Sequence, residues 1–65
     1  MFAKCTTSMG ATYTGFVVAE LTSAEVPKVY HDYFSNRQGQ DRYFLVYDYE
    51  YDELFIKKLG YDIEF

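Results

Sequence analysis

Regularly spaced carboxylates between residues 43 and 52 are the feature of this chain with the most distinctive chemistry. The stretch reads Tyr-Phe-Leu-Val-Tyr-Asp-Tyr-Glu-Tyr-Asp, and the side chains of an extended strand alternate between two faces. One face would begin with apolar residues fit for a core and continue with Asp48, Glu50 and Asp52 at intervals of about 6.7 Å. The other face would carry Tyr43, Leu45, Tyr47, Tyr49 and Tyr51. Such a rigid row of negative charges is suited to binding a basic surface.

The same carboxylates offer little for catalysis or metal binding. General acid–base chemistry needs a pocket that raises the pKa of one carboxyl group, and outward-facing acids in a small domain indicate no such pocket. The run also lacks the glycine-centred loop and the terminal bidentate glutamate of an EF-hand. Cys5 is interpreted as a small buried apolar residue, and His31 as a surface residue. We therefore expect no enzyme activity, no metal and no cofactor.

Negative charge is concentrated in the C-terminal part of the chain. Residues 1–40 carry three acids and three bases, whereas residues 41–65 carry seven acids and three bases and so hold the whole net charge of −4. This distribution opposes direct binding of nucleic acid and favours a basic protein partner. The acids assigned to partner binding are Asp48, Glu50, Asp52, Glu53, Asp62 and Glu64.

Composition predicts one folded domain over residues 1–65. A domain of this length buries only about 60% of the surface of its unfolded chain, so its core needs large side chains, and 22% of the residues are aromatic. The single cysteine allows no internal disulfide and indicates a reducing, cytoplasmic compartment. Neither a signal peptide nor an apolar run of about 20 residues is recognised, so we expect no membrane association.

Strand patterns predict an α+β fold with a small, mostly antiparallel sheet of three to four strands. Residues 2–7 and 12–21 are expected to form a hairpin, in which Gly15 marks a bulge or a close backbone approach. Residues 43–52 form the central strand, and residues 61–65 form a final strand with Asp62 and Glu64 on its outer face.

Helix signals predict one main helix and a second short helix. Thr22 to Glu25 match a capping box, and Pro27 suits the first position of the main helix. The buried stripe of that helix is expected to be Val26, Val29, Tyr30, Tyr33 and Phe34. Residues 52–59 are expected to form the second helix, with Asp52 as its N-cap and Gly60 as its end.

The chain resembles the anti-CRISPR proteins, small inhibitors encoded by phages and mobile elements, and in particular their type I-C members. The resemblance lies in the opening Met-Phe-Ala-Lys-Cys, the length and the acidic run Tyr-Asp-Tyr-Glu-Tyr-Asp. It implies a DNA mimic that occupies the basic DNA-binding groove of a type I interference complex (Cascade), on its Cas8-type subunit, and blocks PAM recognition in the infected bacterial host. The spacing is compatible with mimicry, because carboxylates two residues apart match about every second phosphate of a DNA strand. A monomer is expected.

Three other interpretations of these residues stay open. The carboxylates can serve only to keep the strand soluble and unpaired. A regulatory or antitoxin-like module can bind its partner by strand addition along residues 12–21 or 61–65, and such binding would be nearly independent of salt. A metal-dependent or hydrolytic miniature enzyme would lose its activity to a chelator.

Overall fold

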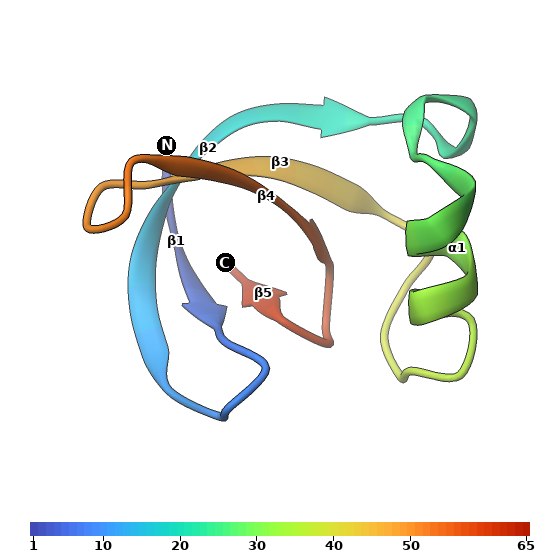
Figure 1. Ribbon diagram of the computed structural model, residues 1–65, viewed down its shortest axis with the longest axis horizontal. Helices are drawn as coiled ribbons and strands as arrows, with labels where there is room; N and C mark the ends of the chain where they lie inside the picture. The colour runs from blue at the N-terminus through green and yellow to red at the C-terminus, as the bar shows by residue number, and fades with distance from the viewer.

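The computed structural model describes residues 1–65 and contains one curled, five-stranded sheet with two short helices at one end (Figure 1). The strands are β1 (Phe2–Thr6), β2 (Thr12–Leu21), β3 (Tyr43–Asp48), β4 (Glu53–Lys58) and β5 (Ile63–Glu64). The 3-10 helix η1 (Ser23–Glu25) and the α-helix α1 (Lys28–Phe34) lie between β2 and β3. The strand order is β4-β3-β2-β1-β5, with every neighbouring pair antiparallel. The curl brings the end of β4 to β5, where Leu59 and Ile63 form a bridge.

The predicted α+β class is confirmed, but the sheet has five strands instead of three to four. The expected hairpin pairs Phe2 with Phe16 and Thr6 with Thr12. The main helix begins at Lys28, directly after Pro27, and the capping box at Thr22 precedes it in η1. The last strand is confirmed only over two residues.

The second predicted helix is wrong, because residues 53–58 form β4. This strand pairs with β3 along its length, with Leu54 opposite Tyr47 and Ile56 opposite Leu45. A helix of two turns is unstable without packing, whereas β3 offers a complete ladder of backbone hydrogen bonds. Asp52 is not an N-cap but has a φ of 53° in the turn before β4. Aspartate tolerates this left-handed conformation better than most residues.

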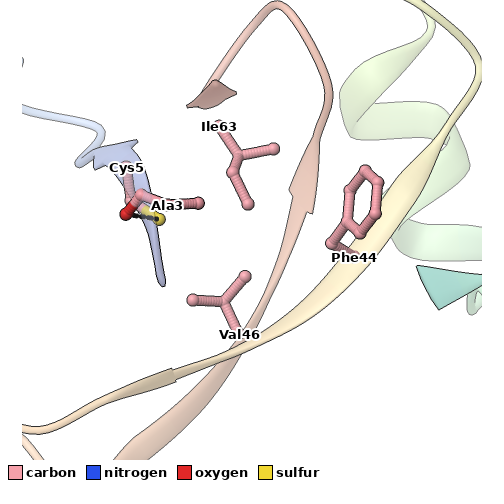
Figure 2. Packing of buried hydrophobic residues seen from close by; sticks show 5 residues of the cluster. All are labelled: Ala3, Cys5, Phe44, Val46 and Ile63. Atoms are coloured by element: carbon pink, nitrogen blue, oxygen red, sulfur yellow. Dashed lines mark hydrogen bonds between the residues drawn. The ribbon is translucent and has the colours of Figure 1, made fainter. Parts of the chain in front are cut away.

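The main core lies on the inner face of the curled sheet. Figure 2 shows its buried side chains converging from β1, β3 and β5: Ala3, Cys5, Phe44, Val46 and Ile63. Cys5 is fully buried and its thiol donates to the Ala3 carbonyl at 3.8 Å, so its interpretation as a core residue is confirmed. Burial raises the pKa of this thiol, which disfavours the reactive thiolate.

Gly15 permits close packing between β2 and this core. A Cβ at Gly15 would overlap Val46 Cγ1 and come within 3.0 Å of the Cys5 sulfur. The predicted close approach is thus confirmed at Gly15, whereas the irregularity of β2 falls between Val17 and Ala19.

A second cluster joins α1 to the outer face of the sheet and consists of Val26, Phe34 and Tyr43. Lys58, at the end of β4, is also buried there. Its Nζ donates to the carbonyl oxygens of Phe34 at 3.1 Å and Arg37 at 2.9 Å. These carbonyls lie at and beyond the C-terminal end of α1, so one ammonium group caps the helix and attaches it to β4.

The predicted buried stripe of the helix is only partly correct. Val26 and Phe34 are buried, whereas Val29, Tyr30 and Tyr33 are exposed. The helix has only seven residues, about two turns, so few of its side chains reach the sheet. His31 is not a free surface residue: it is half-buried, and its Nε2 lies 2.8 Å from the Ser23 carbonyl oxygen. Neither helix has the length and apolar character that crossing a membrane requires.

Candidate functional site

The β3-β4 hairpin replaces the straight carboxylate row that the sequence predicts. β3 ends at Asp48, which is only 6% exposed. Its Oδ1 accepts the backbone amides of Glu50 at 2.8 Å and Tyr51 at 3.4 Å. The Asp52 carboxylate accepts the Tyr47 hydroxyl. The prediction of a straight carboxylate row is therefore wrong. The Asp48 side chain instead accepts the backbone amides of the turn that follows it, as aspartate commonly does at turns.

Three of the six predicted site residues gather at the end of this hairpin. Glu50, Asp52 and Glu53 are exposed and lie within four consecutive positions, and we refer to them as the acidic hairpin end. The ion pairs of the chain are Arg42 with Glu20 and Lys57 with Asp62, so no internal cation neutralises these three carboxylates. They form a local concentration of negative charge open to a partner.

The other predicted acids have different surroundings. Asp62 is partly buried in the turn before β5; its Oδ1 accepts the Lys58 amide at 2.6 Å and its Oδ2 lies 3.9 Å from Lys57 Nζ. Asp62 and Asp48 line one cavity, together with Tyr51 of the hairpin turn. Glu64 is exposed in β5 and stands opposite Lys4 of β1.

An apolar row on the outer face of the sheet adjoins the acidic hairpin end. Phe2 pairs with Phe16, Phe16 with Tyr47, and Tyr47 with Leu54, so one residue from each of four neighbouring strands stands side by side. Tyr49 extends the row, with its ring centroid 5.0 Å from that of Tyr47 and 6.3 Å from that of Phe2. We call these five residues the aromatic row.

The aromatic row is accessible to a partner. Phe2, Tyr49 and Leu54 are 60%, 58% and 57% exposed. Contiguous apolar surface beside charged residues is typical of protein interfaces, where tyrosine and phenylalanine are enriched. Sequence reasoning placed tyrosines near the acids but missed Phe2 and Phe16, because only the sheet register brings them beside Tyr47.

No protein-family model, curated protein or solved structure matches this chain. No cluster of three or more histidine, cysteine or acidic side chains is arranged to hold a metal ion. What the structure presents is a surface with charge and exposed aromatic area, which is suited to binding.

Asp62 gives a pH-dependent prediction. Burial raises the pKa of its carboxyl group above the ordinary value of 3.8, although Lys57 and the Lys58 amide partly oppose this effect. The folded chain therefore holds a proton at this site at pH values where the unfolded chain has lost it. Consequently the contribution of Asp62 to the free energy of unfolding falls as pH rises from 3.8 through the raised pKa, and is then constant.

Urea unfolding of the native chain and of Asp62→Asn across this pH range measures that contribution as a difference. Hydrogen bonds to Arg42 and Thr22 lower the carboxyl pKa values of Glu20 and Glu25, so these two groups make the free energy of unfolding rise with pH. Both proteins contain them, so their effect cancels in the difference. We expect the native chain to lose stability relative to Asp62→Asn as pH rises. An opposite slope would contradict the raised pKa.

Proposed function

We propose that this protein is a binding inhibitor that covers a basic surface of a partner protein with its acidic hairpin end and aromatic row. The observation that carries the proposal is the position of three exposed, unpaired carboxylates beside a band of exposed apolar side chains. Carboxylates attract and orient a basic partner, and aromatic side chains supply buried area after contact.

The resemblance to type I-C anti-CRISPR proteins identifies the partner that we propose. The protein would occupy the basic DNA-binding groove of a type I interference complex, on its Cas8-type subunit, and prevent target DNA from entering. Arginine and lysine side chains that hold phosphates can accept carboxylates in their place. Because the acids form a cluster at a hairpin end instead of a long row, the mimicry would replace a small group of phosphates.

The test is competition between this protein and duplex DNA for the purified interference complex. We expect Glu50→Lys combined with Glu53→Lys to weaken binding at least about tenfold, or about 1.4 kcal/mol, because both substitutions place cations against a basic surface. Asp52 is left unchanged because of its left-handed backbone and its bond to Tyr47. Affinity should also fall steeply with salt.

A matched control separates local charge from net charge. Asp32→Lys combined with Asp41→Lys changes the net charge equally at exposed positions outside the hairpin, and both side chains lack ion pairs. This control should bind the complex much more tightly than the hairpin variant. Equal losses in the two variants, or simultaneous binding of DNA and protein to the complex, would contradict the proposal.

Strand addition is a second candidate, and β4 favours it. The prediction that residues 12–21 form an exposed edge of the sheet is wrong, because β2 pairs with β1 on one side and with β3 on the other. β4 pairs only with β3, and the alternation of the ladder leaves backbone groups of Leu54 and Ile56 facing outward. Binding through this edge would depend little on salt, so the salt dependence of the affinity distinguishes the two modes.

A further inference from the structure

A cavity of about 340 Å³ lies where β4 approaches the β1-β2 turn and α1. Its volume is within the range of sites that enclose a small ligand or a single side chain. Six aromatic residues form much of its lining: Tyr13, Tyr30, Tyr33, Phe34, Tyr51 and Phe55. Tyr49 and Tyr51 of the same hairpin turn therefore belong to different surfaces. Tyr51 lines this cavity, whereas Tyr49 belongs to the aromatic row on the outer face.

The one cation in the lining is already neutralised. Lys57 is buried, and its Nζ donates to the Thr6 carbonyl at 3.1 Å and lies 3.9 Å from Asp62 Oδ2. The same ammonium group lies 5.4 Å from the centre of the Phe55 ring and 5.6 Å from that of Tyr13. The charges of Lys57 and Asp62 therefore neutralise each other, and the hydrogen bond from Lys57 to Thr6 holds β4 against β1.

Asp48 has no such partner. It is 6% exposed and lines the cavity, and no cation of the chain lies within ion-pair distance of it. Its Oδ1 accepts two backbone amides, from Glu50 and Tyr51, and its Oδ2 has no hydrogen bond within the chain. This oxygen stays accessible, because no buried side-chain oxygen of the chain lacks a hydrogen bond. The lining therefore contains one accessible negative charge without a counter-ion, which an incoming cation would balance.

We propose that this cavity receives the guanidinium group of an arginine from the basic partner, with Asp48 as its counter-ion and the aromatic rings around its plane. Guanidinium fits better than ammonium because it is planar, weakly hydrated and stacks on aromatic rings while donating to a carboxylate. The identity of the cation as a partner side chain rests on the proposed function. Tyr51 belongs to the turn that carries Glu50 and Asp52, so a partner at the acidic hairpin end reaches the cavity mouth.

The isolated protein can be tested with methylguanidinium, the end of an arginine side chain, in an NMR titration. We expect saturable shifts of resonances from Tyr13, Phe55 and Lys57, which lie around the cavity. Methylurea has nearly the same shape without the charge and should cause no such shifts. Equal binding of methylurea, or shifts confined to the acidic hairpin end, would overturn the proposal.

Two substitutions test the assigned residues. Asp48→Asn keeps the oxygen that accepts the turn amides and removes the charge, and it should weaken methylguanidinium binding at least about tenfold. Tyr51→Ala should weaken binding about two- to fivefold through the lost ring, whereas Tyr49→Ala, at a similarly exposed position of the same turn, should have no effect. The native dispersion of each variant's spectrum shows that it is folded. Unchanged binding by a folded Asp48→Asn variant would overturn the assignment.

The two proposals fail in different ways. If methylguanidinium binds as expected but the interference complex does not bind the protein, the cavity assignment stands and the proposed function fails. If the complex binds and competes with DNA, yet Asp48→Asn and Tyr51→Ala compete as well as the native chain, the arginine site fails and the proposed function stands.

Discussion

Lys58→Met is expected to lower the free energy of unfolding by about 2–4 kcal/mol. Lys58 is only 4% exposed, and its ammonium group donates to the carbonyl oxygens of Phe34 and Arg37. Methionine preserves most of the buried aliphatic length but leaves both carbonyls without this donor. Because a seven-residue helix has no independent stability, α1 should separate from the sheet in part or completely.

Urea unfolding monitored by circular dichroism measures this loss. Lys28→Met is the matched control, since Lys28 is an exposed lysine at the first position of the same helix. Exposed substitutions usually change stability by no more than about 0.5 kcal/mol. If the two variants unfold at the same urea concentration, the ammonium group does not attach α1 in solution.

Gly15→Val should destabilise the protein by about 3 kcal/mol or more, and Gly15→Ala by about 1–3 kcal/mol. The added Cβ would overlap Val46 Cγ1 and press on the Cys5 sulfur, in a core that has no free space on that side. A domain of 65 residues has a total stability of only about 3–10 kcal/mol, so the valine variant is expected to be largely unfolded.

Ala19→Val is the control for this prediction, because Ala19 is exposed on the same strand and valine favours strand structure. A second variant keeps the prediction testable if Gly15→Val does not fold. Val46→Ala removes the methyl group that the new Cβ would meet, so Gly15→Ala combined with Val46→Ala should be more stable than the sum of the single effects predicts. Simple additivity would show that the steric conflict is not the cause.

The elements that the sequence predicted correctly are those with an unambiguous pattern. Residues 12–21 are rich in β-branched and aromatic residues, and Pro27 marks the start of α1. Residues 53–58 read Glu-Leu-Phe-Ile-Lys-Lys, a short apolar run that fits a strand or a helix equally well. Only the presence of β3 as a pairing partner decides in favour of a strand. Both lysines of this run are buried in the folded chain.

The sequence predicted that exposed acids would form the candidate site, but it did not predict how they are arranged. Glu50, Asp52 and Glu53 are exposed as expected, whereas Asp48 is withdrawn into the turn that it caps. This turn could have been predicted from the sequence, because an aspartate side chain readily accepts a hydrogen bond from the backbone amide two residues later. The aromatic row could not have been found in this way, because its members are aligned only by the register of four strands.

The pairing of β1 with β5 has a consequence for biosynthesis. Lys4 stands opposite Glu64, and Cys5 opposite Ile63, so strands from the two ends of the chain are neighbours in the sheet. A ribosome would have to release almost all of these 65 residues before Ile63 could cover the core. Until β5 pairs, this side of β1 lacks its backbone partners and is open to pairing with other chains.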